Sequence, residues 1–285
     1  MKNLLPLAVT LLMISIGMSL RPGQLLENWR RLTPSLWLRL VAATFLVPPI
    51  LALALGTLLA LDRPTTAGLL IVAVVPGAPL MTRAAVQKGF DIHLAASYQV
   101  WGALLTPVLV PLLIAACGQL YGRDIWVPPI RLIELIAEQQ FAPFLAGMVL
   151  VWLVPSFSAH VQRALNLVGN VLLAVMLVVV LYKMGPAIAA GSPWLLLAAP
   201  LLAVGCLMAV RVLLGQRSRT VATLAICNAN RHVGLAILVS GEQIHDQRPI
   251  PAIAAYALAA VVVMWAYAKM AGRGGEAAAE EPQQA

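Results

Sequence analysis

The chain has 285 residues, of which 61% are hydrophobic and only 11% are charged. Soluble domains carry about 25% charged residues, so this composition excludes an ordinary soluble fold and indicates a polytopic membrane protein. The formal net charge of +8 would suggest nucleic-acid binding in a soluble chain, but Lys and Arg in cytoplasmic loops explain it here. We therefore expect membrane lipid as a partner and no nucleic acid.

The hydropathy pattern predicts nine apolar segments, each near the length of about 20 residues that crosses a bilayer. The first segment follows Lys2 as in a signal peptide, but it lacks a clear small-x-small cleavage site and leads into further apolar segments. We expect one transmembrane domain over residues 1–270, with halves at approximately 1–117 and 130–270, and a disordered cytoplasmic tail over 271–285. The segments are expected at 4–20, 36–60, 66–88, 91–117, 130–154, 158–183, 192–214, 218–240 and 248–270.

The distribution of Lys and Arg predicts the orientation in the membrane. Nine spans place the termini on opposite sides, with twelve Lys and Arg residues on the side of the C-terminus and six on the other. Since cytoplasmic loops are enriched in Lys and Arg, we expect an integral protein of the cell (inner) membrane. Its N-terminus would lie outside and its C-terminus in the cytoplasm.

The third segment, 66–88, is interrupted in its middle by Pro76, Gly77, Ala78 and Pro79. Proline has no backbone N–H and removes a hydrogen bond one turn earlier, while glycine lets the backbone leave helical angles. The carbonyls freed in this way cannot stay bare in lipid, so protein, water or a ligand must meet them. A simple proline kink is the alternative interpretation of this motif.

The eighth segment is interrupted by the sequence CNANRH, which ends at His232. An Arg at the centre of a bilayer costs about 3 to more than 10 kcal/mol, so Arg231 must face a polar cavity or a partner. Its charged fork suits a carboxylate, sulfonate or phosphate. Asn228 and Asn230 favour a break or cap a restarted helix, and His232 adds a donor or bonds a neighbour. The alternative is a structural Arg held by carbonyls of the opposite break.

The two interrupted segments are five segments apart and therefore cross the membrane in opposite directions. A matching pair of interrupted segments in inverted halves is the best sequence indication of a transporter binding site. Gln99 lies in the helix after the first break and is a further candidate for substrate binding. The sequence has no nucleophile–base pair, metal motif or nucleotide loop, so we expect no enzyme, no cofactor and no metal centre.

Three stretches in order along most of the chain resemble the bile acid:sodium symporter family. They are MSLRPGQLLENWRRL…FLVPPILALALG, VVPGAPLMTRAAVQKGFDIHLAAS…LLTPVLVPLL and ICNANRHVGLAILVS. The resemblance implies an all-α fold in which some helices form a panel and the others a core, where two broken helices cross. This chain looks like that fold without its first helix, which agrees with an N-terminus outside.

The resemblance also implies positions for sodium ligands, and most of them are changed here. Where sodium-coupled members have Ser and Asn after the first break, this chain has Met81 and Thr82. In the second break Cys227 stands at a Glu position, Arg231 at a Gln position and His232 at an Asn position, and Thr44 corresponds to a ligating Gln on a preceding helix. A guanidinium among former cation ligands would repel sodium and substitute for it.

These observations predict a secondary transporter that moves a small organic anion by alternating access. Thr44 joins Gln99 as a second-rank candidate for the site. Coupling to protons, to a counter-anion or to nothing is expected in place of sodium. A sodium-coupled organic anion symporter and a non-transporting membrane receptor with the same fold stay open as alternatives.

Overall fold

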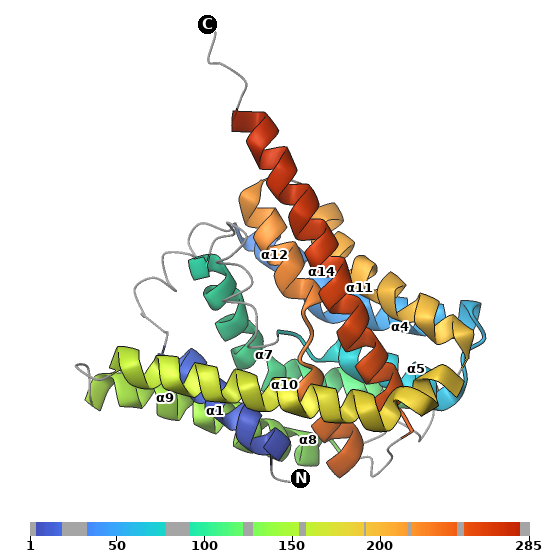
Figure 1. Ribbon diagram of the computed structural model, residues 1–285, viewed down its shortest axis with the longest axis horizontal. Coiled ribbons are helices and arrows are strands. Elements are labelled where there is room, and N and C mark those ends of the chain that lie inside the picture. The colour runs from blue at the N-terminus through green and yellow to red at the C-terminus, as the bar shows by residue number, and fades with distance from the viewer. Residues whose placement is uncertain are drawn as a thin grey trace, which may run out of the picture.

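The computed structural model describes residues 4–18, 33–77, 92–121, 128–153, 158–190, 192–215, 218–243 and 248–279. Within these ranges every regular element is a helix (Figure 1). Seven described spans are long and apolar enough to cross a membrane, and two shorter apolar helices, Leu4–Met18 and Arg63–Val74, lie at the first predicted segment and at the first part of the third, whose residues 78–88 lie outside the described part of the chain. The expected all-α polytopic fold is confirmed.

The first half of the chain has one long bent span between two shorter helices and a final long helix. The π-helical turn η1 joins α3 to α4 without interrupting the span Pro34–Leu58. Helix α5 begins where the side chain of Asp62 accepts a hydrogen bond from the N–H of Thr65, which satisfies one of the unpaired donors of the first turn. The elements are α1 (Leu4–Met18), α3 (Pro34–Val41), η1 (Ala42–Leu46), α4 (Val47–Leu58), α5 (Arg63–Val74) and α7 (Ile92–Tyr121).

The second half repeats the pattern of long helices with one interrupted span. Helix α11 begins after Ser192, whose side chain accepts from the N–H of Trp194, and ends at Gly215, whose φ of +70° is accessible to glycine at little cost. The elements are α8 (Pro129–Ile136), η3 (Ala137–Phe141), α9 (Ala142–Leu153), α10 (Ser158–Ala190), α11 (Pro193–Leu214), α12 (Arg219–Ala229), α13 (Val233–Leu238), η4 (Val239–Gln243) and α14 (Ile250–Ala279).

The end of α14 differs from the sequence expectation. The helix continues to Ala279, so residues 271–279 are helical where a disordered tail was predicted. This stretch ends in Glu276 and three alanines, and Ala is the residue with the highest helix propensity. Residues 280–285 lie outside the described part of the chain.

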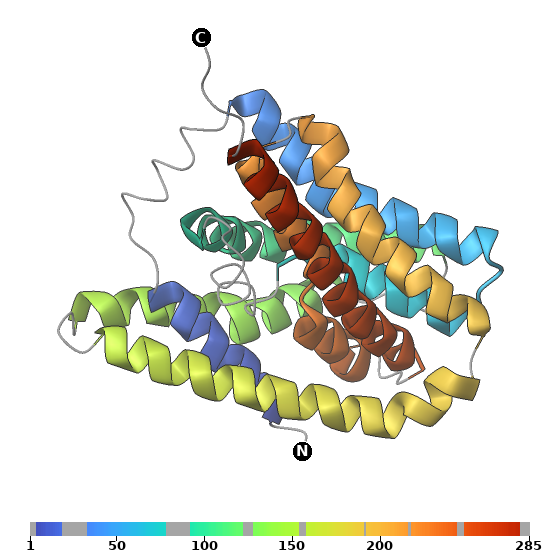
Figure 2. The ribbon, with the colours of Figure 1, turned by 45° about the horizontal axis from the view of Figure 1, so that its top comes forward.

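Helices α1, α9 and α10 form a layer along one edge of the molecule, which we call the three-helix layer (Figures 1 and 2). Its helices approach closely because glycines face one another. A Cβ on Gly17 would lie 2.1 Å from the carbonyl oxygen of Phe144, and one on Gly147 would lie 2.1 Å from that of Ile14. Such a close approach of two backbones is typical of helix pairs in membranes. The hydrophobic effect does not drive helix association there, and small residues allow close van der Waals packing instead.

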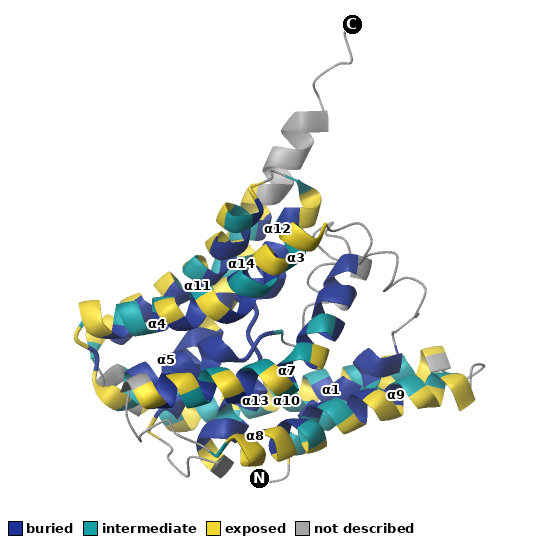
Figure 3. Ribbon diagram, turned by 180° about the vertical axis from the view of Figure 1, so that it is seen from behind, coloured by how far each residue is buried: buried dark blue, intermediate teal, exposed yellow. Residues whose placement is uncertain are grey.

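Helices α3–α4, α5, α7, α11 and α14 form the core group together with α12 and α13, the two halves of the second interrupted span. Residues 223–229 of α12 are all buried, whereas α10 shows exposed valines and leucines along its outer face (Figure 3). Because exposed apolar side chains suit contact with lipid, this burial pattern places α12 at the centre and α10 at the periphery.

Candidate functional site

The two breaks meet inside the molecule. Helix α5 ends at Val74, Val75 is extended with φ −94° and ψ 103°, and Gly77 has a φ of +66°. The N–H of His232, in the second break, donates to the carbonyl oxygen of Val75 at 3.3 Å. The break at Pro76 and Gly77 is thus confirmed, and one of its freed carbonyls is met by the opposite break. Ala78 and Pro79 lie outside the described residues.

The second break is shorter than the sequence suggested. Helix α12 continues through Cys227 and Asn228 to Ala229, and only residues 230–232 leave helical geometry. The side chain of Asn228 bonds to other helices and not to its own backbone, so it does not compete with the helix. Cys227 is buried within α12.

The π-helical turn η1 supplies two free carbonyl oxygens to this region. The N–H of Val47 donates to Ala42, five residues back, and in this register the donors for Ala43 and Thr44 would be residues 48 and 49. Both of these are proline and have no N–H. The oxygen of Ala43 instead accepts from Asn228 Nδ2 at 3.0 Å, and that of Thr44 accepts from Arg231 Nη1 at 2.8 Å.

Asn228 is the centre of a buried polar network that joins four helical spans. Its Nδ2 also donates to the carbonyl oxygen of Cys206 in α11 at 2.6 Å. Its Oδ1 accepts from the hydroxyl of Tyr98 in α7 and from Arg231 Nη2, each at 3.1 Å. The Tyr98 hydroxyl also lies 3.1 Å from the hydroxyl of Thr44. A network satisfied to this degree orients its members because any unpaired group would be costly in the low-dielectric interior.

Arg231 is 1% exposed, and the partners of its guanidinium are neutral. Nη1 and Nη2 are held by Thr44 and Asn228, and Nη2 also lies 3.8 Å from Cys206 Sγ. Within the described ranges Nε has no hydrogen-bond partner. The expected open fork is therefore not available, because both terminal nitrogens bind protein. What remains is a positive charge with no carboxylate partner among the described residues, and an Nε–H without an acceptor there.

His232 provides the cap that sequence reasoning assigned to an asparagine. Its Nδ1 accepts from the N–H of Leu235 at 3.1 Å at the start of α13. In the neutral imidazole an accepting Nδ1 leaves the proton on Nε2. Nε2 is buried and, in the part of the chain that the structure describes, has no partner. It is a second N–H donor beside Arg231.

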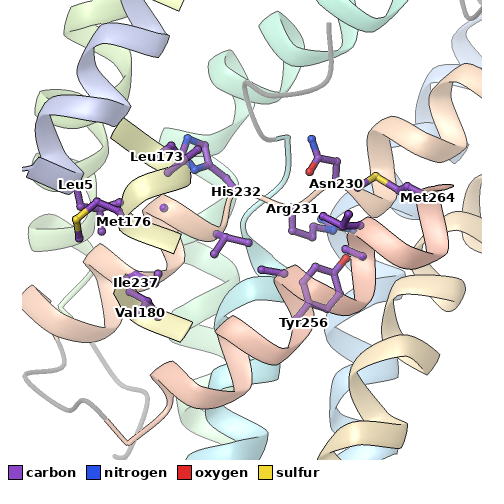
Figure 4. Close-up of a pocket in the computed structure, with 15 residues that line it drawn as sticks. Leu5, Leu173, Met176, Val180, Asn230, Arg231, His232, Ile237, Tyr256 and Met264 are labelled. Atoms are coloured by element: carbon purple, nitrogen blue, oxygen red, sulfur yellow. The ribbon is translucent and has the colours of Figure 1, made fainter. Parts of the chain in front are cut away.

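A cavity of about 70 Å³ lies between the three-helix layer and the core group, at the second break (Figure 4). Its polar end is formed by Asn230, Arg231, His232 and Tyr256, and the Tyr256 hydroxyl itself donates to the oxygen of Ala229 at 2.7 Å. Its walls are apolar side chains of α1, α10, α13 and α14. The arrangement places a fixed positive charge and two buried N–H donors, Arg231 Nε and His232 Nε2, in residues that line a cavity with apolar walls.

The structure thus divides the predicted site residues. Asn230, Arg231 and His232 line the cavity, whereas Asn228 and Thr44 hold Arg231 from behind. Gln99 is buried in α7 and is not among the residues that line the cavity. Met81 and Thr82 lie outside the described residues.

Sequence reasoning missed three members of the site, Tyr98, Tyr256 and Cys206. Tyr98 could have been considered because it is a polar aromatic residue inside a span, next to the candidate Gln99. The pair Pro48–Pro49 was also a signal, since two consecutive prolines in a span must free carbonyls that need partners.

The family model described as "Sodium Bile acid symporter family" matches residues 6–191, which is more than half of the chain. The matched range includes the first break and the π-helical turn, and ends before the second break. No curated protein matches the chain.

Proposed function

The chain belongs to the sodium bile acid symporter family, and we propose that it moves a small organic anion by alternating access without coupling to sodium. The family is one of membrane transporters and not of enzymes, and the seven long apolar spans indicate an integral membrane protein. The substrate and the driving ion are the parts that we propose.

The buried charge of Arg231 is the observation that carries the proposal for an anion. The partners that the structure gives its guanidinium are uncharged, so its desolvation is offset only by dipoles. An anion in the adjacent cavity would supply the missing negative charge. It would also accept from Nε of Arg231 and from Nε2 of His232, both of which are otherwise without partners among the described residues.

The position of the cavity supports alternating access. It lies between the three-helix layer, which contributes Leu5 and Leu173, and the core group, which contributes the second break and α14. A relative movement of the two groups would open one side of the cavity and close the other, which is the motion that transporters built from inverted repeats use.

The carbonyl oxygens of Ala43 and Thr44 support the absence of sodium coupling. Free backbone carbonyl oxygens inside a membrane protein are suitable cation ligands, but here those of Ala43 and Thr44 are taken by Asn228 and Arg231. The guanidinium thus fills the place of a monovalent cation, and its charge would repel a second one. Coupling to protons or exchange with a counter-anion is proposed in its place.

The proposed setting is the cell (inner) membrane, with the N-terminus outside and the C-terminus in the cytoplasm. In this orientation the side richer in Lys and Arg faces the cytoplasm, as membrane proteins generally show.

Uptake into proteoliposomes tests the proposal. Radiolabelled butyrate, glutarate and taurocholate are offered with an inward gradient of sodium or of potassium, and protein-free liposomes give the passive flux. We expect protein-dependent uptake of at least one anion at equal rates in both gradients. Strict dependence on sodium would refute the replacement of the cation by Arg231, and an Arg231→Gln variant with normal uptake would refute its part in anion binding.

A further inference from the structure

The cavity at the second break has one charged end and one apolar end. The polar groups come from three consecutive residues, Asn230–His232, and from Tyr256, while Met176 and Ile237 lie across the cavity from Arg231 and Tyr256 (Figure 4). The described residues that line the cavity include one arginine and no acidic side chain. A ligand that matches this surface carries its charge at one end only.

A second negative charge on the ligand would lie against the apolar wall. Burying an unpaired carboxylate costs several kcal/mol because no counter-charge replaces the lost water. Its two oxygens would also lack donors beside Met176 and Ile237. The cavity therefore discriminates against dicarboxylates of the same length, and a neutral molecule would leave the charge of Arg231 uncompensated.

The volume of the cavity limits the body of the ligand. An engineered apolar cavity of about 150 Å³ accepts benzene, and the cavity here has about half that volume, about 70 Å³. A single chain of a few carbon atoms matches this space better than a fused ring system, which is larger than benzene. Residues with small side chains, Ala257 and Ala260, form part of the wall, so a larger residue at either position would shorten the chain that fits.

We infer that the ligand of this cavity is a short aliphatic monocarboxylate. Its carboxylate accepts hydrogen bonds from Arg231 Nε and His232 Nε2, and its chain lies along Met176 and Ile237. The inference rests on the proposed function and names the substrate class of that same site.

A thermal-shift titration of the full-length protein in detergent tests the inference. The ligands are the potassium salts of acetate, butyrate, hexanoate, glutarate and taurocholate, with butyramide as the neutral analogue of butyrate, at constant pH and ionic strength. A ligand that binds the folded state raises the melting temperature by mass action. We expect butyrate to bind at least about tenfold more tightly than glutarate, butyramide or taurocholate, which corresponds to about 1.4 kcal/mol.

Two variants locate the binding. Ala257→Leu fills the cavity and should weaken butyrate at least about tenfold, whereas Ala266→Leu, at an exposed position of the same helix outside the cavity, should leave its affinity unchanged. His232→Ser keeps an oxygen that caps α13 but has no N–H at the reach of the imidazole Nε2, and should weaken butyrate about tenfold, the worth of one hydrogen bond to a charged group. The ability of Ser to cap keeps this variant folded.

The outcomes separate the two proposals. Tighter binding of glutarate or taurocholate than of butyrate would overturn the substrate class and leave anion transport intact. Equal weakening of butyrate by Ala257→Leu and Ala266→Leu would overturn the location. Absence of binding by all the anions, together with absence of uptake in proteoliposomes, would overturn the proposed function itself.

Discussion

Removal of the Arg231 side chain should open a site for a free cation. The guanidinium donates to the carbonyl oxygen of Thr44 at 2.8 Å and to Asn228 Oδ1 at 3.1 Å. In Arg231→Ala the Thr44 oxygen would lose its donor, since residue 49 is proline, while Asn228 Oδ1 would keep the hydroxyl of Tyr98. The variant would thus hold an empty cradle of oxygens in the shape of the lost group.

The expected destabilisation follows from these contacts. Hydrogen bonds to charged groups contribute about 1.5–3 kcal/mol each, so the two bonds set an upper limit of about 6 kcal/mol. One acceptor keeps a partner, and removal of the buried charge relieves its desolvation, so we expect a net loss of about 3 kcal/mol in the free energy of unfolding. Guanidinium chloride at ten times its Kd should then restore about 1.4 kcal/mol.

The assay is a melting curve in detergent with millimolar guanidinium chloride or, as the control salt, tetramethylammonium chloride. Sodium chloride in a third series reports whether the opened cradle accepts a metal ion. Arg211→Ala is the matched control variant, because Arg211 donates to the Tyr267 hydroxyl at 2.9 Å near the end of α11 and belongs to no such cradle. If Arg231→Ala is as stable as the unmodified protein, or if both variants respond equally to guanidinium, the reasoning about a tethered cation is wrong.

Three further predictions concern the support of the site and the stability of the fold. Tyr98→Phe removes the hydroxyl that bonds Asn228 and Thr44 and should cost about 1–2 kcal/mol; a double-mutant cycle with Asn228→Ala that shows no coupling would contradict the network. Pro49→Ala supplies an N–H that competes with Arg231 for the Thr44 oxygen. Anion uptake should therefore fall severalfold, while the free energy of unfolding changes by about 1 kcal/mol or less. Unchanged uptake would contradict this competition. Gly17→Ala places a Cβ 2.1 Å from the Phe144 oxygen and should lower the free energy of unfolding by about 2 kcal/mol or more. The control Gly102→Ala, whose Cβ meets nothing within 4 Å, should stabilise α7 by about 0.5–1 kcal/mol. Equal melting temperatures of the two variants would refute the close contact of α1 and α9.

The sequence alone determined that the chain forms apolar helices and that two of them are interrupted. Apolar runs of membrane-spanning length predict helices because lipid offers no other partner for the backbone, and Pro76–Gly77 must interrupt one of them for a local reason. The cost of Arg231 in lipid likewise marked the second break as the candidate site, without knowledge of any neighbour. These conclusions depend on the chain and the bilayer only.

The tertiary structure decided what each group at the site does. Whether Arg231 Nη1 is open to a ligand depends on the Thr44 oxygen, 187 residues away in sequence, and the π-helical turn that frees this oxygen is stabilised by its contacts with other helices. The choice of His232 over an asparagine as the cap of α13 depends on its bond to Leu235, while Asn228 is engaged by the oxygens of Ala43 and Cys206. Hydrogen bonds between distant segments follow from packing, and residue order does not specify which acceptor a buried donor will reach.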